Sequence, residues 1–120
     1  RVKSLNTHSD STGHATAELT LVVDGTEVKQ KVNGMGPVDA AFNAIKSILG
    51  VKPHLQLFQV HAITQGTDAQ AECTVRLEDD GRTVNGQGAH EDTITAATRA
   101  YVAAVNKMWD KRGKLDPWTL

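Results

Sequence analysis

The 120-residue sequence predicts an α+β fold that is internally duplicated, a (βββα)x2 arrangement with antiparallel sheets and two helices. Residues 15–23 and 69–78 alternate apolar and polar side chains with the period of a half-buried strand. Each run leads through a turn and a return strand to a stretch with helical spacing of its apolar residues. The segments A-T-A-E-L-T at 15–20 and A-Q-A-E-C-T at 69–74 also match, which indicates an internal repeat.

In the first half, the turn and the helix give the clearest signals. Asp24-Gly25 favours a type I′ hairpin turn, because both residues accept the positive φ values that this turn needs. Pro37 suits the first turn of a helix, and Gly50 ends the apolar repeat that follows it. In order, we expect a short strand at 1–5, a polar loop at 6–13, strands at 15–23 and 27–32, and a helix at 37–49.

The second half repeats this order after a linker at Lys52-Pro53. The strand at 55–64 is apolar on both faces, which is typical of a strand that is buried on both sides or whose second face meets a partner. In the last helix, Ala96, Ala100 and Ala104 allow a neighbour to approach closely. In order, we expect strands at 55–64 and 69–78, turns at 65–68 and 79–81, a return strand at 82–84, a helix at about 92–110 that Gly113 ends, and a tail at 114–120.

A pair of glycines occurs in each half, in N-G-M-G at 33–36 and in N-G-Q-G at 85–88. Each pair follows a strand-like run and precedes a helical run, so we expect two equivalent turns that leave peptide N–H groups unpaired at a helix start. Such groups favour a small anion, for example an amino-acid carboxylate. The alternative is that the glycines only turn the strand into the helix. Asp39 and Glu91 stand where the dinucleotide pattern G-x-G-x-x-G has its last glycine, which argues against a pyrophosphate.

Size and charge limit the classes of function. We expect one domain, 1–120, with pseudo-repeats at about 1–50 and 54–112 and a tail at 113–120. A net charge of −1 gives no reason to expect nucleic acid as a partner. The sequence has no apolar run of the roughly 20 residues that cross a membrane, and its single cysteine favours the cytoplasm. Because the chain opens on Arg rather than Met, we expect it to belong to a longer protein.

The sequence contains no pattern typical of a catalytic or metal centre. The five histidines lack metal-ligand spacing, so each is expected to be solvated or locally hydrogen-bonded. Asp39, Glu91 and Asp92 fall at helix starts, where capping is the expected role. Cys73 lies on the apolar face of a strand, where an inert thiol is the common outcome. We therefore expect no catalytic residue, metal or cofactor in this chain itself.

Small residues on one strand suggest a place for a ligand. Ala69 and Ala71 face inward if the alternation holds, opposite Phe58, Val60 and Ala62 if the two strands pair. One interpretation is an apolar hollow of modest size beside these alanines. The other is a tight contact between helix and sheet.

The motifs G-M-G-P-V-D-A-A at 34–41, G-T-D-A-Q-A at 66–71 and G-Q-G-A-H-E-D at 86–92, with A-A-V-N-K at 103–107, resemble the C-terminal regulatory domain of the 2-isopropylmalate synthases. The resemblance covers residues 1–110. It implies a duplicated βββα fold, a homodimer, and feedback inhibition of leucine biosynthesis by leucine bound near the dimer interface. The acyltransferase reaction, which condenses acetyl-CoA with 2-oxoisovalerate, would belong to a separate TIM-barrel domain of the same chain that holds a divalent metal.

The resemblance also implies an effector pocket that draws on the first helix start and on two facing strands. Its residues are Gly34, Gly36, Pro37, Val38, Asp39, Leu55, Phe58, Ala62, Ala69 and Ala71. Met35 stands where the family usually has a small or polar residue, and Phe58 stands where a tyrosine is common. Alternation puts Leu55 on the face opposite Phe58 and Ala62, so either a bulge intervenes or Leu55 belongs to an interface.

Other functions stay open at this point. Citramalate synthase carries a similar domain that responds to isoleucine, so the effector is leucine or isoleucine. A dimerisation module indifferent to amino acids would have the same fold with purely structural glycines. A small independent enzyme would need a cluster of titratable residues that the sequence does not display.

Overall fold

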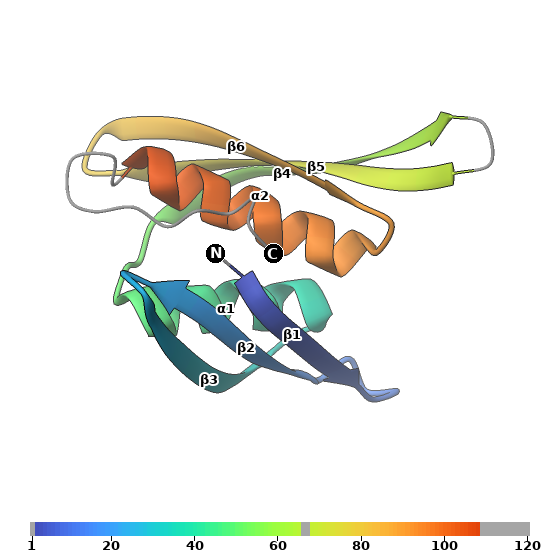
Figure 1. The fold of residues 1–120 in the computed structure, drawn as a ribbon, viewed down its shortest axis with the longest axis horizontal. Helices are drawn as coiled ribbons and strands as arrows, with labels where there is room; N and C mark the ends of the chain where they lie inside the picture. The colour runs from blue at the N-terminus through green and yellow to red at the C-terminus, as the bar shows by residue number, and fades with distance from the viewer. Residues whose placement is uncertain (1, 66–67, 109–120) are drawn as a thin grey trace.

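The chain forms the order βββαβββα in the computed structural model, as the sequence predicts (Figure 1). The structure describes residues 2–65 and 68–108, together with their side chains except those of residues 63–65, 68 and 69. The described elements are β1 (Val2–Ser9), β2 (Ala15–Val23), β3 (Thr26–Gly34), α1 (Pro37–Leu49), β4 (His54–Gln65), β5 (Asp68–Asp79), β6 (Arg82–His90) and α2 (Thr93–Met108).

The strands form two antiparallel sheets, one in the order β1-β2-β3 and one in the order β4-β5-β6. α1 packs on the first sheet and α2 on the second, and the two helices lie against each other between the sheets (Figure 1). The predicted α+β class and the internal duplication are therefore confirmed. Both helices start at the same end of the molecule, where β4 also ends (Figure 1).

Two hairpin turns follow the sequence prediction. Asp24 and Gly25 have φ values of 50° and 79°, and Asp80 and Gly81 have φ values of 53° and 79°. Positive φ at both central residues is the property of a type I′ turn, and it matches the right-handed twist of the strands on either side. The repeat of this turn shows that the two units fold by the same local rule.

An aromatic contact joins the two units. The ring of Phe42 on α1 lies 4.5 Å from the ring of Tyr101 on α2, and 5.7 Å from the ring of Phe58 on β4, which it meets edge to face. Contacts of this kind contribute about 0.5–1.5 kcal/mol each beyond the apolar area that they bury. Burial raises the pKa of the Tyr101 hydroxyl above its ordinary value. The main core is continuous through these rings from one half to the other.

The prediction of a polar loop at 6–13 is wrong for residues 6–9, because β1 continues to Ser9. Asn6 and His8 are exposed and pair with Glu18 and Thr16 of β2, on the outer side of the sheet. Backbone pairing with a long neighbouring strand therefore decides the structure here, although the side chains are polar.

The second glycine pair does not form a turn at a helix start, so the expected equivalence of the two pairs is wrong. Gly86 and Gly88 lie inside β6, where they pair with Val75 and Cys73. A Cβ atom on Gly86 would stand 2.2 Å from the carbonyl oxygen of Ala100. The reason for these glycines is the close approach of α2, which crosses β6 there.

The small residues of α2 allow this approach, as the sequence predicts. Ala96, Ala100 and Ala104 are fully buried, and they are the residues whose backbone atoms lie over Gly86 and Gly88. At the other end of α2, the guanidinium of Arg82 donates hydrogen bonds to the carbonyls of Lys107 (2.9 Å) and Met108 (3.1 Å). The predicted end of this helix at 110–113, the tail, and the centre of the turn at 65–68 lie outside the described residues.

We expect Gly88→Ala to lower the free energy of unfolding by about 1–3 kcal/mol or more, the usual cost of overpacking. Its Cβ would stand 2.6 Å from backbone atoms of Ala96 and Ala100, which cannot move without displacing α2. Urea unfolding followed by circular dichroism measures the change. Gln87→Ala is the matched control, because Gln87 is exposed between the two glycines. Equal stability of both variants would contradict the close packing of α2 on β6.

Candidate functional site

The start of α1 is open. Its N-cap is Gly36, at φ 107° and ψ 160°, and no side chain caps the helix from that position. The first intrahelical bond runs from the N–H of Ala40 to the carbonyl of Gly36 at 3.0 Å. Pro37 has no N–H, so the amides of Val38 and Asp39 remain as the free donors of the first turn in the described part of the chain. Two N–H groups and the positive end of the helix dipole thus point outward.

The carboxylate of Asp39 holds the loop in front of this helix. Its Oδ2 atom accepts a hydrogen bond from the N–H of Met35 at 2.8 Å and lies 3.5 Å from the amide nitrogen of Asn43. Asn43 also donates to the carbonyl of Asn33 at 3.2 Å. Asp39 therefore has the capping role that the sequence indicates, and one carboxylate oxygen stays available for a cation.

Gly34 has a packing role at this site. A Cβ atom there would stand 2.4 Å from the backbone nitrogen of Ala40, so α1 can sit on the end of β3 only because position 34 is glycine. Ala15, Ala17, Ala40 and Ala41 complete a small-residue contact between α1 and the first sheet. The glycines before α1 thus do two things, since Gly34 permits packing and Gly36 adopts the left-handed φ.

The start of α2, by contrast, is closed by its own side chains. The Oδ2 atom of Asp92 accepts hydrogen bonds from the N–H of Thr95 (3.0 Å) and from its hydroxyl (2.7 Å). The ring of His90 accepts the N–H of Asp92 at 3.0 Å. The hydroxyl of Thr95 is the main reason why the pKa of Asp92 is lowered. Among the described residues, the start of α1 therefore keeps free N–H groups, whereas Asp92 caps the start of α2.

The second group of predicted residues lies on the helix-facing side of the second sheet. Phe58 pairs with Val75 and Ala62 pairs with Ala71, so all four side chains share that side. Ala71 is only 8% exposed and belongs to the main core, whereas Ala62 is exposed. Ala71 is therefore packed into the main core of the single chain. The side chain of Ala69 lies outside the described residues.

A bulge decides the position of Leu55. The register of β4 against β5 shifts between Leu55 and Leu57, and Leu55 pairs with Leu77 of the buried side. This bulge puts Leu55 on the same side as Phe58 and Ala62, which strict alternation would not. Leu55 nevertheless stands seven positions before Ala62, about 20 Å along the strand at roughly 3.3 Å per residue. The two residues cannot contact one leucine molecule within a single chain.

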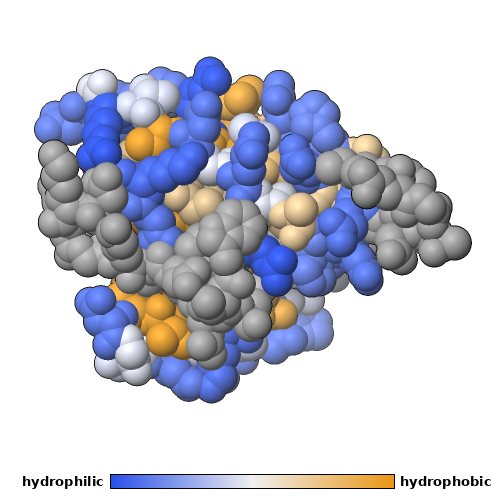
Figure 2. Space-filling view, turned by 45° about the horizontal axis from the view of Figure 1, so that its top comes forward, coloured by the Kyte–Doolittle hydropathy of each residue, from blue (hydrophilic) through white to orange (hydrophobic). Residues whose placement is uncertain are grey.

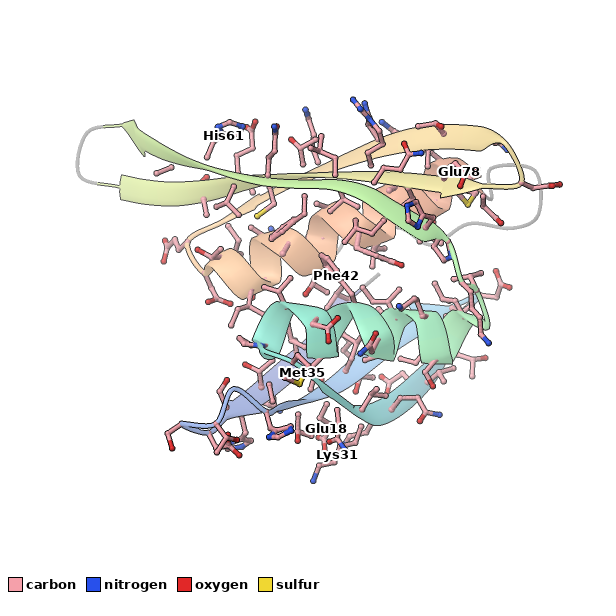
Figure 3. The ribbon with its side chains drawn as sticks, turned by 180° about the vertical axis from the view of Figure 1, so that it is seen from behind. Glu18, Lys31, Met35, Phe42, His61 and Glu78 are labelled. Carbon is pink, nitrogen blue, oxygen red and sulfur yellow. The ribbon has the colours of Figure 1, made fainter. Side chains whose placement is uncertain are left out.

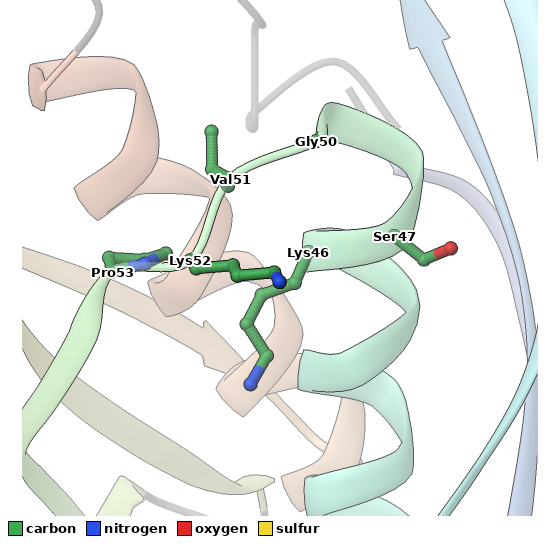
Figure 4. Close-up of a pocket in the computed structure, with 6 residues that line it drawn as sticks. All are labelled: Lys46, Ser47, Gly50, Val51, Lys52 and Pro53. Atoms are coloured by element: carbon green, nitrogen blue, oxygen red, sulfur yellow. The ribbon is translucent and has the colours of Figure 1, made fainter.

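The structure brings the two groups to one end of the molecule without joining them into one cavity. Val38 and Phe58 both pack on the main core, and the start of α1 lies at the same end as the far part of β4 (Figure 1). The described surface hollows have other linings. One, of about 480 Å³, lies between α1 and the linker and is lined by Lys46, Ser47, Gly50, Val51, Lys52 and Pro53 (Figure 4). Another, of about 340 Å³, lies at the β1–β2 hairpin and includes His8, His14 and Asn33.

No group of three His, Cys, Asp or Glu side chains among residues 2–65 and 68–108 is placed to hold a metal ion. His14 and His90 make local hydrogen bonds, and His8, His54 and His61 are exposed. Cys73 is fully buried, and this burial raises the pKa of its thiol. No helix of the described residues is long and apolar enough to span a membrane.

The structure defines the class of the chain as a duplicated βββα module, in which two three-stranded antiparallel sheets enclose two helices and one helix start is open. The family model of the LeuA allosteric (dimerisation) domain matches residues 1–109. The chain belongs to this family.

Relatives of the chain carry the name 2-isopropylmalate synthase. The protein of Caulobacter sp. (strain K31) is 50% identical over 117 residues, which cover 98% of this chain and 22% of that protein. The protein of Aromatoleum aromaticum is 50% identical over 110 residues, 92% of this chain and 22% of that protein. The protein of Burkholderia vietnamiensis is 46% identical over 114 residues, which cover 95% of this chain and 22% of that protein. The chain thus spans about a fifth of the length of these relatives.

We expect Asp92→Ala to lower the free energy of unfolding by about 1 kcal/mol at neutral pH, the usual value of an N-cap. Because the pKa of Asp92 is lowered in the folded chain, its contribution is present above the unfolded pKa of about 3.9 and is lost as the pH falls through the folded pKa. The difference in the free energy of unfolding between Asp92→Ala and the parent chain should therefore disappear at acidic pH. Denaturant unfolding at several pH values measures it. Glu91→Ala is the control, because Glu91 is exposed. A difference that persists unchanged at pH 2 would refute the cap.

Proposed function

We propose that this chain is the regulatory domain of a cytoplasmic 2-isopropylmalate synthase, that it acts as a homodimer, and that it binds leucine as a feedback inhibitor. The observation that carries the proposal is the open start of α1, with the free N–H groups of Val38 and Asp39, in a chain that belongs to the LeuA allosteric (dimerisation) family. The catalytic domain of the same enzyme, with its divalent metal, lies in a separate part of the parent protein.

The chemistry of the α1 start suits an amino acid. The leucine carboxylate needs hydrogen-bond donors, which the amides of Val38 and Asp39 supply together with the helix dipole. The leucine ammonium needs an acceptor, and the free carboxylate oxygen of Asp39 is one. Phe58 and Ala62, on the apolar side of β4, are the proposed walls for the isobutyl group, whose burial is worth about 1.5–3 kcal/mol. Gly34, Gly36 and Pro37 give the loop its shape.

The proposed site needs a second copy of the chain. Leu55 and Ala62 lie too far apart on β4 to touch one ligand, and Ala62 is exposed in the single chain. In a twofold dimer whose β4 strands cross in opposite directions, Leu55 of one chain approaches Ala62 of the other. It also agrees with the hollows at the end of α1 and at the β1–β2 hairpin, which are lined by other residues.

Inhibition follows from a difference in affinity. A ligand shifts a conformational equilibrium only to the extent that it binds one state more tightly than another. We propose that leucine binds more tightly to the dimer arrangement in which the attached catalytic domains are less active. Met35, which is 69% exposed beside the open helix start, and Phe58 are the residues expected to tune the effector preference.

A second candidate function is dimerisation without any effector. It is favoured by the burial of Ala71 and by the packing role of Gly34, which leave less of the predicted pocket free than an apolar hollow would need. An isoleucine-responsive domain of a citramalate synthase is the other alternative, since the α1 start would accept the backbone groups of either amino acid.

Isothermal titration calorimetry of the chain with leucine, isoleucine and valine tests the proposal. We expect saturable heat with leucine at micromolar to low millimolar concentration, and weaker binding of isoleucine and valine. A preference for isoleucine would favour the citramalate synthase alternative. Absence of heat with all three amino acids, in a sample that is dimeric, would leave the dimerisation module as the function.

Ala62→Phe should weaken leucine binding at least tenfold, because a ring would fill the proposed place of the isobutyl group beside Phe58. Gln59→Phe is the matched control. Gln59 pairs with Thr74 on the outer side of the sheet, so its ring would point away from the site. Calorimetry compares the two variants, and equal leucine affinity of both would remove Ala62 from the effector site.

A further inference from the structure

The hairpin of β1 and β2 brings two histidines to one hollow. His8 pairs with Thr16 across the two strands, and the N–H of Asp10 donates to the carbonyl of His14 at 3.0 Å. His8 and His14 are therefore diagonal neighbours on the hairpin, and both line the hollow of about 340 Å³ described above. The Cβ atoms of such a diagonal pair are about 7 Å apart, so two imidazole rings can reach one point between them.

The hollow opens on the outer side of the first sheet. Successive residues of a strand alternate sides, and Ala17 of β2 packs against α1, so Thr16 faces away from that helix. Figure 3 shows Glu18 and Lys31 on this outer side as well. The ring of His8 is exposed and has no hydrogen-bond partner among the described residues, so its nitrogens are available for a ligand.

Asp10 and Thr12 fix the protonation state of the His14 ring. The hydroxyl of Thr12 donates to the Oδ1 atom of Asp10 at 2.5 Å, and its oxygen lies 2.8 Å from the Nδ1 atom of His14. Because the hydroxyl has only one proton and gives it to the carboxylate, the Nδ1 atom of His14 carries the proton of the second hydrogen bond. The Nε2 atom of a neutral His14 ring is therefore unprotonated. The Thr12 hydroxyl also lowers the pKa of the Asp10 carboxyl, which keeps that group ionised at neutral pH.

An imidazole that donates from one nitrogen to a fixed acceptor and keeps the other nitrogen bare has the usual arrangement of a metal ligand. Neutral imidazole suits zinc, copper and nickel ions. A tetrahedral zinc ion binds ring nitrogens at roughly 2.0–2.1 Å and holds water where the protein supplies no ligand. The side chains of Thr16 and Asn33, which are joined by a hydrogen bond of 3.1 Å in the lining of the hollow, offer polar atoms to such water molecules.

We propose that His8 and His14 together bind a divalent transition-metal ion such as zinc, with water in the remaining coordination positions. Only two ligands come from the protein, which agrees with the absence of any group of three candidate ligands in the described part of the chain. The bound ion joins β1 to β2 at the turn end of their hairpin. The inference does not depend on the proposed function, because neither histidine belongs to the predicted effector pocket.

Isothermal titration calorimetry of the 120-residue chain, without a histidine tag, with zinc chloride and with nickel chloride tests the site. We expect one ion per chain and a dissociation constant in the micromolar range. His8→Ala and His14→Ala should each weaken binding about tenfold or more, because each leaves a single protein ligand.

His61→Ala is the matched control, because His61 is also an exposed histidine on a strand. It lies on the outer side of the second sheet, on the opposite side of the molecule from Glu18 and Lys31 (Figure 3). The face of the molecule in Figure 2 is largely hydrophilic, so one more exposed polar side chain does not by itself make a site. The loss of His61 should change the affinity for zinc less than about twofold.

Thr12→Val tests the role of the hydroxyl between Asp10 and His14. Without this hydroxyl the His14 ring loses the acceptor of its Nδ1 proton, so zinc binding should weaken about tenfold. Thr12→Ser keeps the hydroxyl and should bind zinc like the parent chain. Nuclear magnetic resonance of the ¹⁵N-labelled imidazole rings gives an independent result, because zinc should shift the Nε2 signal of His14 and leave its Nδ1 atom protonated.

The proposal is overturned if zinc and nickel give no saturable heat up to millimolar concentration, or if His8→Ala and His14→Ala bind both ions like the parent. Binding of one ion per two chains would also overturn it, because exposed histidines of separate copies would then share the ion. Circular dichroism of each variant shows whether it is folded, and the ring signals of the parent chain test the site without any substitution. A chain that binds zinc here but takes up no leucine would refute the proposed function and leave this inference intact.

Discussion

The contact of Phe42 with Tyr101 and Phe58 is the interaction on which the arrangement of the molecule depends. Each βββα unit can bury one face of its helix on its own sheet, but its other apolar side chains need the second unit. Phe42 supplies this link, because its ring meets a helix and a strand of the other half. The link also sets the position of α1 relative to β4. The open helix start and the end of β4 consequently lie at the same end of the molecule (Figure 1).

The two units have the same topology, but they differ in the residues at their helix starts and in the role of their glycines. Both units have the same order of elements, yet Gly36 leaves the start of α1 open, whereas Asp92 and Thr95 close the start of α2. The glycines differ in the same way, because Gly36 shapes a helix start and Gly88 makes room for a helix across a strand. One unit has kept the donors that an anion needs, and the other has used them for stability. In the proposed function, the unit with the open helix start is the one that binds the effector.

Local rules account for what the sequence predicted well. Pro37 and Gly50 set the limits of α1, and Asp24-Gly25 defined a hairpin, because these residues act on the backbone beside them. The use of Gly86 and Gly88 could not be predicted, since a glycine at a turn and a glycine under a helix look alike in sequence. The bulge at Leu55 was offered only as one of two explanations, because a register shift depends on the partner strand. The candidate site could be predicted only in parts, since its residues lie on separate elements whose relative placement depends on the whole fold.

The most direct test of the central claim is a titration of leucine into the ¹⁵N-labelled dimer, followed by nuclear magnetic resonance of the backbone amides. The claim is that leucine binds at the open start of α1. The account predicts saturable shifts of the Gly36, Val38 and Asp39 signals, with Gly86 and Gly88 unchanged. Shifts confined to the hollow around Gly50 and Val51, or no shifts at saturating leucine, would contradict it.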